Sequence, residues 1–251
     1  MKHSIPVSLN IGSSLTGGFS RVVNRNGLLL TLAYLFLGVV WQVAFYSAFV
    51  TWLHGTDAQM ADVPLPTLDV PLALSAIVAV VSLLLLQLVA IVSIRTFVGG
   101  HTDKIPSAYY TRNIVTVLAN TLVGGFVYGL LVFLGTLLVV IPGIIAYVAF
   151  LFTLVYIAVE DENFVAALRD SWTLTRGNWL PLFGLLLIIF VGLGLIPVIM
   201  AAVVSFVVSA YAGPAISTLV SGVITLPFSL LVLGILAEAF VQLRGDATTD
   251  L

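Results

Sequence analysis

The stretch EDENFVAALRDSWTLTRGNW, residues 160–179, is the long charged interruption in the second half of the chain, and it leads into the apolar run 180–190. At 100° per residue, its two tryptophans fall on an apolar side and two arginines fall on the opposite side. Indole rings favour the boundary between headgroups and hydrocarbon. The pattern therefore predicts an interfacial helix over residues 161–178, with Asp161 as its N-cap. The alternative is a solvated connector whose apolar side packs on the protein. The residues assigned to the interface here are Arg169, Trp172, Arg176 and Trp179.

The composition decides the broad class of protein. Of the 251 residues, 61% are hydrophobic and only 8% are charged, whereas soluble domains carry about 25% charged residues. Because this small number of charged side chains cannot cover a water-exposed surface, we expect most of the surface to face lipid. The near-neutral net charge of −2 argues against nucleic acid as a partner, and the absence of cysteine excludes disulfides and thiolate sites.

Apolar runs predict an all-α, polytopic membrane bundle of six transmembrane helices, arranged as three hairpins in a single domain over residues 1–251. Residues 141–143, Ile-Pro-Gly, suit a type II turn between the third and fourth spans. Gly192, Gly194 and Pro197 predict a kink or local break near the outer end of the fifth span. The predicted spans are residues 27–53, 71–94, 113–140, 144–159, 180–205 and 215–241.

The basic residues divide the loops into two kinds. With six spans, all nine Lys and Arg fall on one side of the membrane, and the opposite loops contain none. Basic loops are retained in the cytoplasm, so we expect a multi-pass protein of the cell membrane with both termini in the cytoplasm. The nine residues are Lys2, Arg21, Arg25, Arg95, Lys104, Arg112, Arg169, Arg176 and Arg244.

A second amphipathic segment, residues 8–26, precedes the first span. Apolar side chains recur at helical spacing, and Arg21 and Arg25 fall on the opposite side, which assigns both arginines to the membrane interface. Gly17 and Gly18 weaken this helix. An Arg beside Asn or Gly recurs before the first, third and fifth spans, which suggests three repeated hairpins. The alternative is that every cytoplasmic helix start attracts Arg and Asn.

Residues 166–179, AALRDSWTLTRGNW, with the apolar residues that follow, carry a family resemblance. The pattern resembles the membrane domain that is fused to some glycerophosphodiester phosphodiesterases, together with its stand-alone, uncharacterised bacterial and archaeal relatives. The resemblance covers residues 160–190 and implies a membrane protein of six helices. It does not imply hydrolase activity, because the soluble phosphodiesterase barrel needs about 250 residues of its own.

Five residues inside or near the predicted spans are candidates for polar or ion-pair positions. Glu238 lies near the cytoplasmic end of its span, where burial of a charge costs less than the ~2.5–3.5 kcal/mol expected at the bilayer centre. Arg95, at the end of the second span, is expected at similar depth, so the two residues are expected to form an ion pair. The alternative is a proton or substrate site. Gln42, Gln87 and Asn120 are expected to bond neighbouring helices, or alternatively to line a polar pathway.

No catalytic or cofactor-binding motif stands out, so we expect no enzyme activity, no cofactor and no metal site. His54, Asp57 and Asp62 offer only weak cation ligands on a proline-rich loop. The favoured function is a non-enzymatic interaction or organising module, whose partners are the lipid bilayer and a second membrane protein. The alternative is a transporter or channel for a small or lipidic solute. This alternative is favoured by the spans that Gly and Pro interrupt.

Overall fold

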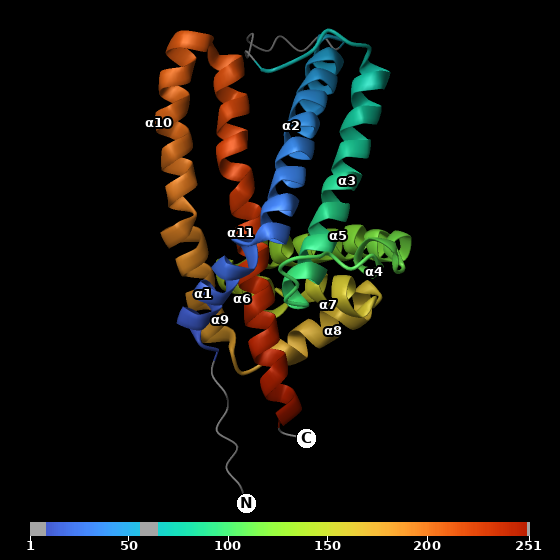
Figure 1. The fold of residues 1–251 in the computed structure, drawn as a ribbon, viewed down its shortest axis with the longest axis vertical. Coiled ribbons are helices and arrows are strands. Elements are labelled where there is room, and N and C mark those ends of the chain that lie inside the picture. The colour runs from blue at the N-terminus through green and yellow to red at the C-terminus, as the bar shows by residue number, and fades with distance from the viewer. Residues whose placement is uncertain (1–8, 56–64, 250–251) are drawn as a thin grey trace, which may run out of the picture. The chain divides into compact units, whose positions relative to one another are not determined.

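The computed structural model describes residues 9–55 and 65–249, and within these residues it contains helices and no β-strand (Figure 1). Six helical stretches are long and apolar enough to cross a membrane, which confirms the expected all-α class and the number of candidate spans. They are Arg25–His54, Leu72–Val98, Ile114–Leu138, Val140–Glu160, Trp179–Ala212 and Pro214–Gly245.

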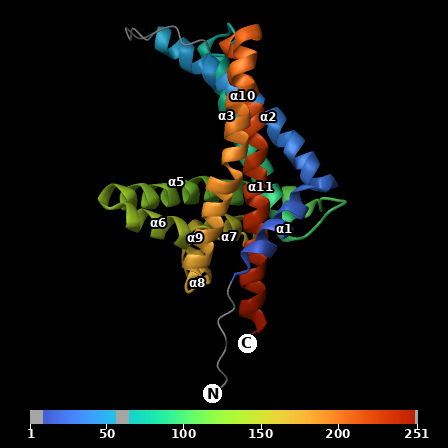
Figure 2. The same ribbon diagram turned by 90° about the vertical axis from the view of Figure 1, so that its left-hand side faces the viewer.

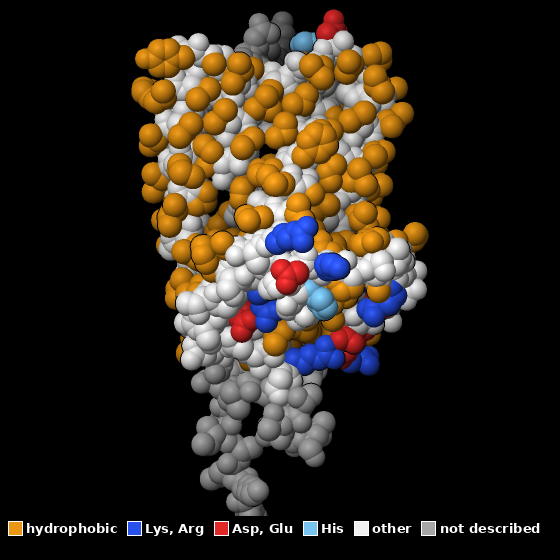
Figure 3. Space-filling view, in the orientation of Figure 1, with side chains coloured by type: hydrophobic (Ala, Val, Ile, Leu, Met, Phe, Trp, Pro, Cys, Tyr) orange, Lys and Arg blue, Asp and Glu red, His pale blue; other side chains and the backbone are white. Residues whose placement is uncertain are grey.

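The chain divides into two compact units. Unit 1 comprises Met1–Leu28, Ile91–Ile189 and Leu231–Leu251, and unit 2 comprises Leu29–Ala90 and Phe190–Leu230. All eight Lys and Arg among the described residues belong to unit 1. On the face drawn in Figure 3, charged side chains gather over elements of unit 1, and apolar side chains cover the helices of unit 2. The uneven distribution of Lys and Arg between the two kinds of loop is therefore also an uneven distribution between the two units.

Unit 2 takes its residues from four long helices: α2 (Arg25–His54), α3 (Leu72–Val98), α10 (Leu195–Ala212) and α11 (Pro214–Thr249). The turn between α10 and α11 is made by Gly213, whose φ of 84° is a conformation that glycine adopts without strain. A proline follows at the first position of α11, where its missing N–H costs no helical hydrogen bond.

Hydroxyl groups hold α10 against α11 inside unit 2. The Ser217 hydroxyl donates to the Ser205 carbonyl at 3.0 Å, and the hydroxyls of Ser205 and Ser221 are hydrogen-bonded to each other. Small side chains let helix backbones approach closely in a membrane, where hydrophobic burial does not drive helices together. The spacing of serines along α11 thus explains why this pair of helices stays together.

The fifth candidate span is irregular near its middle. It begins as α9 (Trp179–Leu187), passes through the π-helical segment η1 (Ile188–Leu193) and continues as α10. Pro197 has no backbone N–H, so it leaves the carbonyl of Leu193 without its usual helical donor. The local break expected from the glycines and proline of this region is confirmed, and it takes the form of a π segment.

Unit 1 begins with α1 (Ile11–Val22), which is capped by the Asn10 side chain. Its paired glycines do not prevent the helix from forming. A Cβ added at Gly18 would lie 2.4 Å from the Cα of Ile235, so glycine is required there for α1 to pack directly on the backbone of α11. Phe19 is 56% exposed, whereas Ser14, Gly18 and Val22 are buried, so small and polar residues form most of the side of α1 that packs on the protein.

The hairpin of α5 (Ile114–Leu138) and α6 (Val140–Ala149) also belongs to unit 1, and the two helices lie side by side (Figures 1 and 2). The turn expected at residues 141–143 lies earlier, at Val139, which is the extended residue between the two helices. The Ile-Pro-Gly sequence forms part of the first turn of α6, where proline is tolerated. A Cβ at Gly143 would lie 2.0 Å from Thr136 Oγ1, so this glycine lets the two helices meet.

The fourth candidate span is not one uninterrupted helix. It consists of α6 and α7 (Thr153–Glu160), separated by a turn over residues 150–152. Then α8 (Phe164–Thr175) follows, and its Asn163 side chain accepts hydrogen bonds from the first free N–H groups of the helix. The short helix α4 (Ala108–Thr111) lies between α3 and α5.

Candidate functional site

Arg95 is the most deeply buried charged residue among the described side chains, with 2% of its side chain exposed. Its Nε donates to the Ala158 carbonyl at 2.5 Å, and its Nη1 donates to the carbonyls of Tyr109 at 2.8 Å and Arg112 at 3.2 Å. Its Nη2 donates to Asp161 Oδ1 at 2.7 Å. A planar guanidinium offers five donors in a fixed fork, and here they join three segments of unit 1. Arg95 is therefore a structural hub.

Asp161 completes this hub from the end of α7. The residue adopts a left-handed backbone with φ of 57°, and its Oδ2 accepts from Arg112 Nε at 2.9 Å and from Asn113 Nδ2 at 3.0 Å. The expectation that Asp161 caps the next helix is wrong, because Asn163 does so. Its carboxylate is instead bound by two guanidiniums, which compensates for the cost of burying the Arg95 charge.

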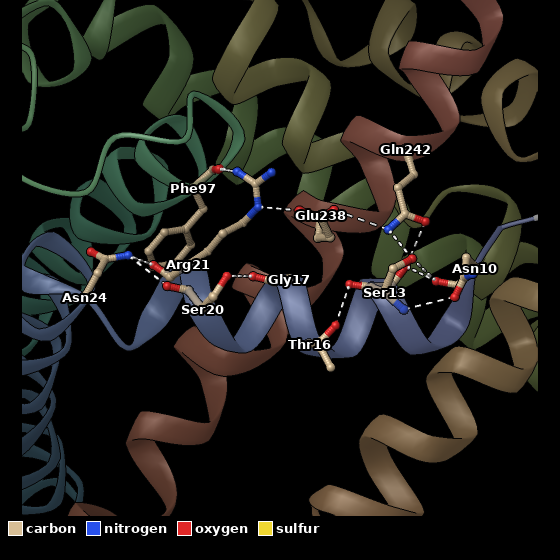
Figure 4. A network of polar contacts seen from close by, with 11 residues as sticks. Asn10, Ser13, Thr16, Gly17, Ser20, Arg21, Asn24, Phe97, Glu238 and Gln242 are labelled. Carbon is tan, nitrogen blue, oxygen red and sulfur yellow. Dashed lines mark hydrogen bonds and ion pairs between the residues drawn. The ribbon is translucent and has the colours of Figure 1, made fainter.

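Glu238 does not pair with Arg95, contrary to the expectation from depth. It forms an ion pair with Arg21 of α1, with 2.6 Å between Nε and Oε2 (Figure 4). Gly17 makes room for this carboxylate, since a Cβ there would lie 2.7 Å from Glu238 Cδ. Gln242 Nε2 donates to the second carboxylate oxygen at 3.3 Å. The ion pair was expected, but its partner comes from α1, which packs along α11.

A cavity of about 250 Å³ opens beside the Arg21–Glu238 pair. The Nη1 of Arg21 donates to the carbonyl of Phe97 at the end of α3, which fixes the guanidinium at the cavity wall (Figure 4). The other lining residues come from α1, the turn after α1, the end of α3 and the loop after α3, and all belong to unit 1. They are Ser20, Asn24, Thr96, Phe97, Gly100, His101 and Thr102.

The three amides predicted inside spans do not gather at this cavity. Gln42 donates to the Thr218 carbonyl at 3.3 Å within unit 2. In unit 1, Asn120 accepts from the backbone N–H of Phe164 at 3.2 Å, at the start of α8. Gln87 is a half-buried residue of α3 within unit 2. The expected contacts between helices are therefore seen for Gln42 and Asn120, and none of the three amides lines the cavity.

The sequence did not reveal the role of two residues of α8, Ser171 and Thr175, whose hydroxyls bind backbone groups. Both are fully buried on α8, and both donate to the Ala149 carbonyl, at 3.1 Å and 3.0 Å. The Ser171 oxygen also accepts from the Phe152 N–H at 3.0 Å. These bonds satisfy backbone groups left over where α6 ends and α7 begins. A spacing of four residues between two hydroxyls, facing an apolar stretch, was the signal available in the sequence.

The exposed edge of α8 carries the residues assigned to the membrane interface. Trp172 is 39% exposed and meets Trp179 edge to face, with ring centroids 5.2 Å apart. Arg169 and Arg176 are exposed on the same helix and its end, and neither forms an ion pair with another described residue. Whereas the arginines of the hub are bound by carboxylates, these two cations remain available to a group outside the chain.

The carboxyl group of Glu162 lies between α7 and α8, outside the candidate spans. Burial, the largest cause, and repulsion from Asp170 and Glu160 together raise the pKa of Glu162 from 4.5 to about 7. Glu160 is paired with Arg244 of α11, which partly opposes this shift of the Glu162 pKa. The protonation of Glu162 therefore changes near neutral pH. The cation ligands considered at Asp57 and Asp62 lie outside the described residues.

The fold defines the class of protein: an α-helical membrane protein with six helices long and apolar enough to span a bilayer. The chain belongs to the family described as a domain of unknown function, DUF7847, whose family model matches residues 9–243. The match includes the Arg95 hub, the cavity and the hydroxyls of α8. No curated protein and no solved structure matches the chain.

Proposed function

We propose that the chain is a non-enzymatic organising module of the cytoplasmic membrane, which holds anionic lipid headgroups at the exposed edge of α8. The observation that carries the proposal is the division among the described basic residues. Four are bound by carboxylates and four are exposed without an ion pair in the described part of the chain. The bound residues are Arg21, Arg95, Arg112 and Arg244, and the others are Arg25, Lys104, Arg169 and Arg176.

Two features of α8 support lipid headgroups as the occupant. The exposed Trp172 ring, which meets Trp179 edge to face, suits the depth at which indole rings concentrate. Arg169 and Arg176 then lie beside it without a carboxylate to neutralise them. An arginine near an anionic surface contributes about 1 kcal/mol, so loss of both weakens the attraction about thirtyfold.

Lipid retention tests this proposal. The purified chain is reconstituted with defined mixtures of phosphatidylglycerol and phosphatidylcholine, extracted in mild detergent and analysed for bound lipid. We expect the chain to retain phosphatidylglycerol selectively, and we expect the double variant Arg169→Gln/Arg176→Gln to lose that selectivity. The matched variant Arg169→Lys/Arg176→Lys keeps the charge and is expected to retain it. Equal retention of both lipids by the unaltered chain contradicts the proposal, and so does unchanged selectivity in the Gln variant.

We also infer the orientation of the chain from the charge division. Since unit 1 holds all eight of the described Lys and Arg, its charged surface belongs on the cytoplasmic side, and both termini then lie in the cytoplasm. The chain has no cysteine, so single cysteines introduced at Thr56 and at Thr248 report their own side of the membrane. Impermeant thiol reagents applied to intact cells should label the first position alone. Labelling of both positions, or of Thr248 alone, contradicts this orientation.

A transporter or channel for a small or lipidic solute is the second candidate. It is favoured by the π segment Ile188–Leu193, because transporters build substrate sites at interrupted helices. Two assays in proteoliposomes distinguish it from the organising module: transbilayer movement of a fluorescent phospholipid, and efflux of a small dye. Movement of either probe above protein-free vesicles supports the transporter. The Glu238→Gln variant then tells whether that carboxylate takes part.

A further inference from the structure

The structure assigns a ligand class to the cavity beside Arg21 and Glu238. We propose that it binds a zwitterion that carries a phosphate and a primary ammonium, the chemistry of a phosphoethanolamine group. The inference goes beyond the lipid contact proposed for α8, because it concerns a different surface of unit 1 and a group without net negative charge.

Arg21 brings unused donors to the wall of this cavity. Its Nε is bound to Glu238 and its Nη1 to the Phe97 carbonyl. A guanidinium has five N–H donors, so three of them have no partner among the described residues. Arginine binds phosphate oxygens through two parallel hydrogen bonds when two donors are available side by side. The Arg21 guanidinium is therefore held in place by the protein and still able to hold a phosphate.

Glu238 brings unused acceptor capacity to the same wall. Its two oxygens accept one hydrogen bond from Arg21 and one from Gln242 among the described residues. An ionised carboxylate has about four lone-pair sites, so both oxygens can accept again. The Ser20 and Thr96 hydroxyls donate to carbonyls of their own helices, at 2.7 Å each, and their oxygens remain acceptors. These acceptors suit the N–H groups of an ammonium.

The balance of charge decides between ligand classes. The cavity wall contains one guanidinium and one carboxylate, which already neutralise each other. A purely anionic ligand meets repulsion from Glu238, and a purely cationic ligand meets repulsion from Arg21. A ligand with both charges a few bonds apart complements both groups at once. The Arg21–Glu238 pair therefore selects a zwitterion by its electrostatics.

The chemistry of the cation narrows the class further. The carboxylate and the two hydroxyl oxygens all accept hydrogen bonds, and a primary ammonium supplies three donors. A trimethylammonium group has no N–H to donate and leaves these acceptors unpaired, which lowers affinity. His101, whose Nδ1 lies 3.3 Å from the Tyr109 hydroxyl, adds a polar ring to the cavity. We therefore expect phosphoethanolamine to bind more tightly than phosphocholine.

Binding to the full chain in detergent tests the proposal and separates two sources of the ligand. The soluble probes are phosphoethanolamine, phosphocholine and inorganic phosphate, titrated by calorimetry. The membrane probes are nanodiscs of phosphatidylethanolamine or phosphatidylcholine, with bound lipid counted by native mass spectrometry. Preference for phosphoethanolamine in solution identifies a free zwitterion, and preference confined to the nanodiscs identifies a lipid headgroup. Either preference supports the proposal. Absence of both overturns it, and so does binding of inorganic phosphate as tight as that of phosphoethanolamine.

Two variants test the assigned roles. Arg21→Gln is expected to weaken binding of the preferred probe about tenfold or more, because a charge-assisted bond to phosphate is lost. Glu238→Gln is expected to abolish the preference for ethanolamine over choline. Arg244→Gln is the matched control, since it breaks a different ion pair, with Glu160, whose residues do not line the cavity. Should Arg21→Gln fail to fold, Ser20→Ala removes one of the lining hydroxyl acceptors without removing a charge. Unchanged preference in both Glu238→Gln and Ser20→Ala overturns the assignment.

Discussion

The hydroxyl of Ser171 accepts a hydrogen bond from the backbone N–H of Phe152 at 3.0 Å, across 19 residues of sequence. It donates at the same time to the Ala149 carbonyl at 3.1 Å, so one side chain of α8 bonds both sides of the break between α6 and α7. Unpaired backbone groups are costly away from water. The break in the fourth candidate span is therefore a built feature, held by α8.

Replacing Ser171 by Ala should destabilise the protein measurably. The change leaves the Phe152 N–H without its partner, and an orphaned buried donor costs about 1–3 kcal/mol. The Ala149 carbonyl keeps its bond to Thr175, so the double variant with Thr175→Val should be less stable still. Thermal unfolding in detergent, followed by circular dichroism, measures both. Thr173→Ala is the control, since this exposed hydroxyl only bonds a carbonyl of its own helix. A midpoint for Ser171→Ala equal to that of the control contradicts the role given to Ser171.

Arg95 and Arg112 bind the same carboxylate and should differ widely in their contribution to stability. Arg95→Met removes the guanidinium donors to the buried Ala158 carbonyl, to the Tyr109 and Arg112 carbonyls and to one oxygen of Asp161, and breaking a buried ion pair costs about 3–5 kcal/mol. Arg112→Met removes a side chain that is 51% exposed, and exposed pairs are worth about 1 kcal/mol or less. Chemical denaturation of the two variants under the same conditions compares them. Equal losses of stability would show that Arg95 is not the hub of unit 1.

Glycines of α1 should respond in opposite ways to the same substitution. Gly18→Ala places a methyl group 2.4 Å from the Cα of Ile235, and forcing such a contact costs about 1–3 kcal/mol. Gly12→Ala meets nothing nearer than 3.5 Å, and alanine is favoured over glycine in a helix by about 1 kcal/mol. The first variant should unfold at a lower temperature than the unaltered chain and the second at an equal or higher one. The reverse order contradicts the packing of α1 on α11.

Stability should fall as the pH rises from about 4.5 to about 7, because of Glu162. Its pKa is raised in the folded protein from 4.5 to about 7, so the fold favours its protonated form. The stabilisation from that form is complete below pH 4.5 and is lost as the pH passes through 7. Glu162→Gln mimics the protonated side chain, so at pH 8 it should be more stable than the unaltered chain. Unfolding midpoints at pH 5.5 and pH 8 measure this. A pH dependence that survives Glu162→Gln assigns the effect to another group.

The number of apolar helices was predictable because hydropathy sums along the chain and needs no knowledge of neighbours. The ion pairs were not predictable in this way. Arg95 and Glu238 were matched by expected depth, but depth gives no direction around a helix. The partner of Glu238 is Arg21, because glycines let α1 pack on α11. The partner of Arg95 is Asp161, because the left-handed residue at the end of α7 turns its carboxylate inward.

The sides of α8 and α1 that pack on the protein could not be predicted from the sequence for a related reason. The sequence divides α8 into an apolar and a charged side, but its fully buried residues are Ala167, Ser171 and Thr175. In α1 the buried residues are Ser14, Gly18 and Val22, of which the first two are small or polar. In a membrane protein large apolar side chains can face lipid, so small and hydroxyl residues mark contacts between helices. The alternation of apolar and charged residues, which locates the packed side of a helix in a soluble protein, does not reveal a packed side made of small and hydroxyl residues.

The break between α6 and α7 affects the order in which segments of the chain reach their final positions. Ser171 and Thr175 leave the ribosome 19 and 26 residues after the backbone groups that they satisfy. Until they emerge, the Phe152 amide has no partner in hydrocarbon, where each unsatisfied group costs several kcal/mol. We therefore expect the fourth apolar stretch to stay near the membrane surface during translation and to take its final place after α8 has been synthesised.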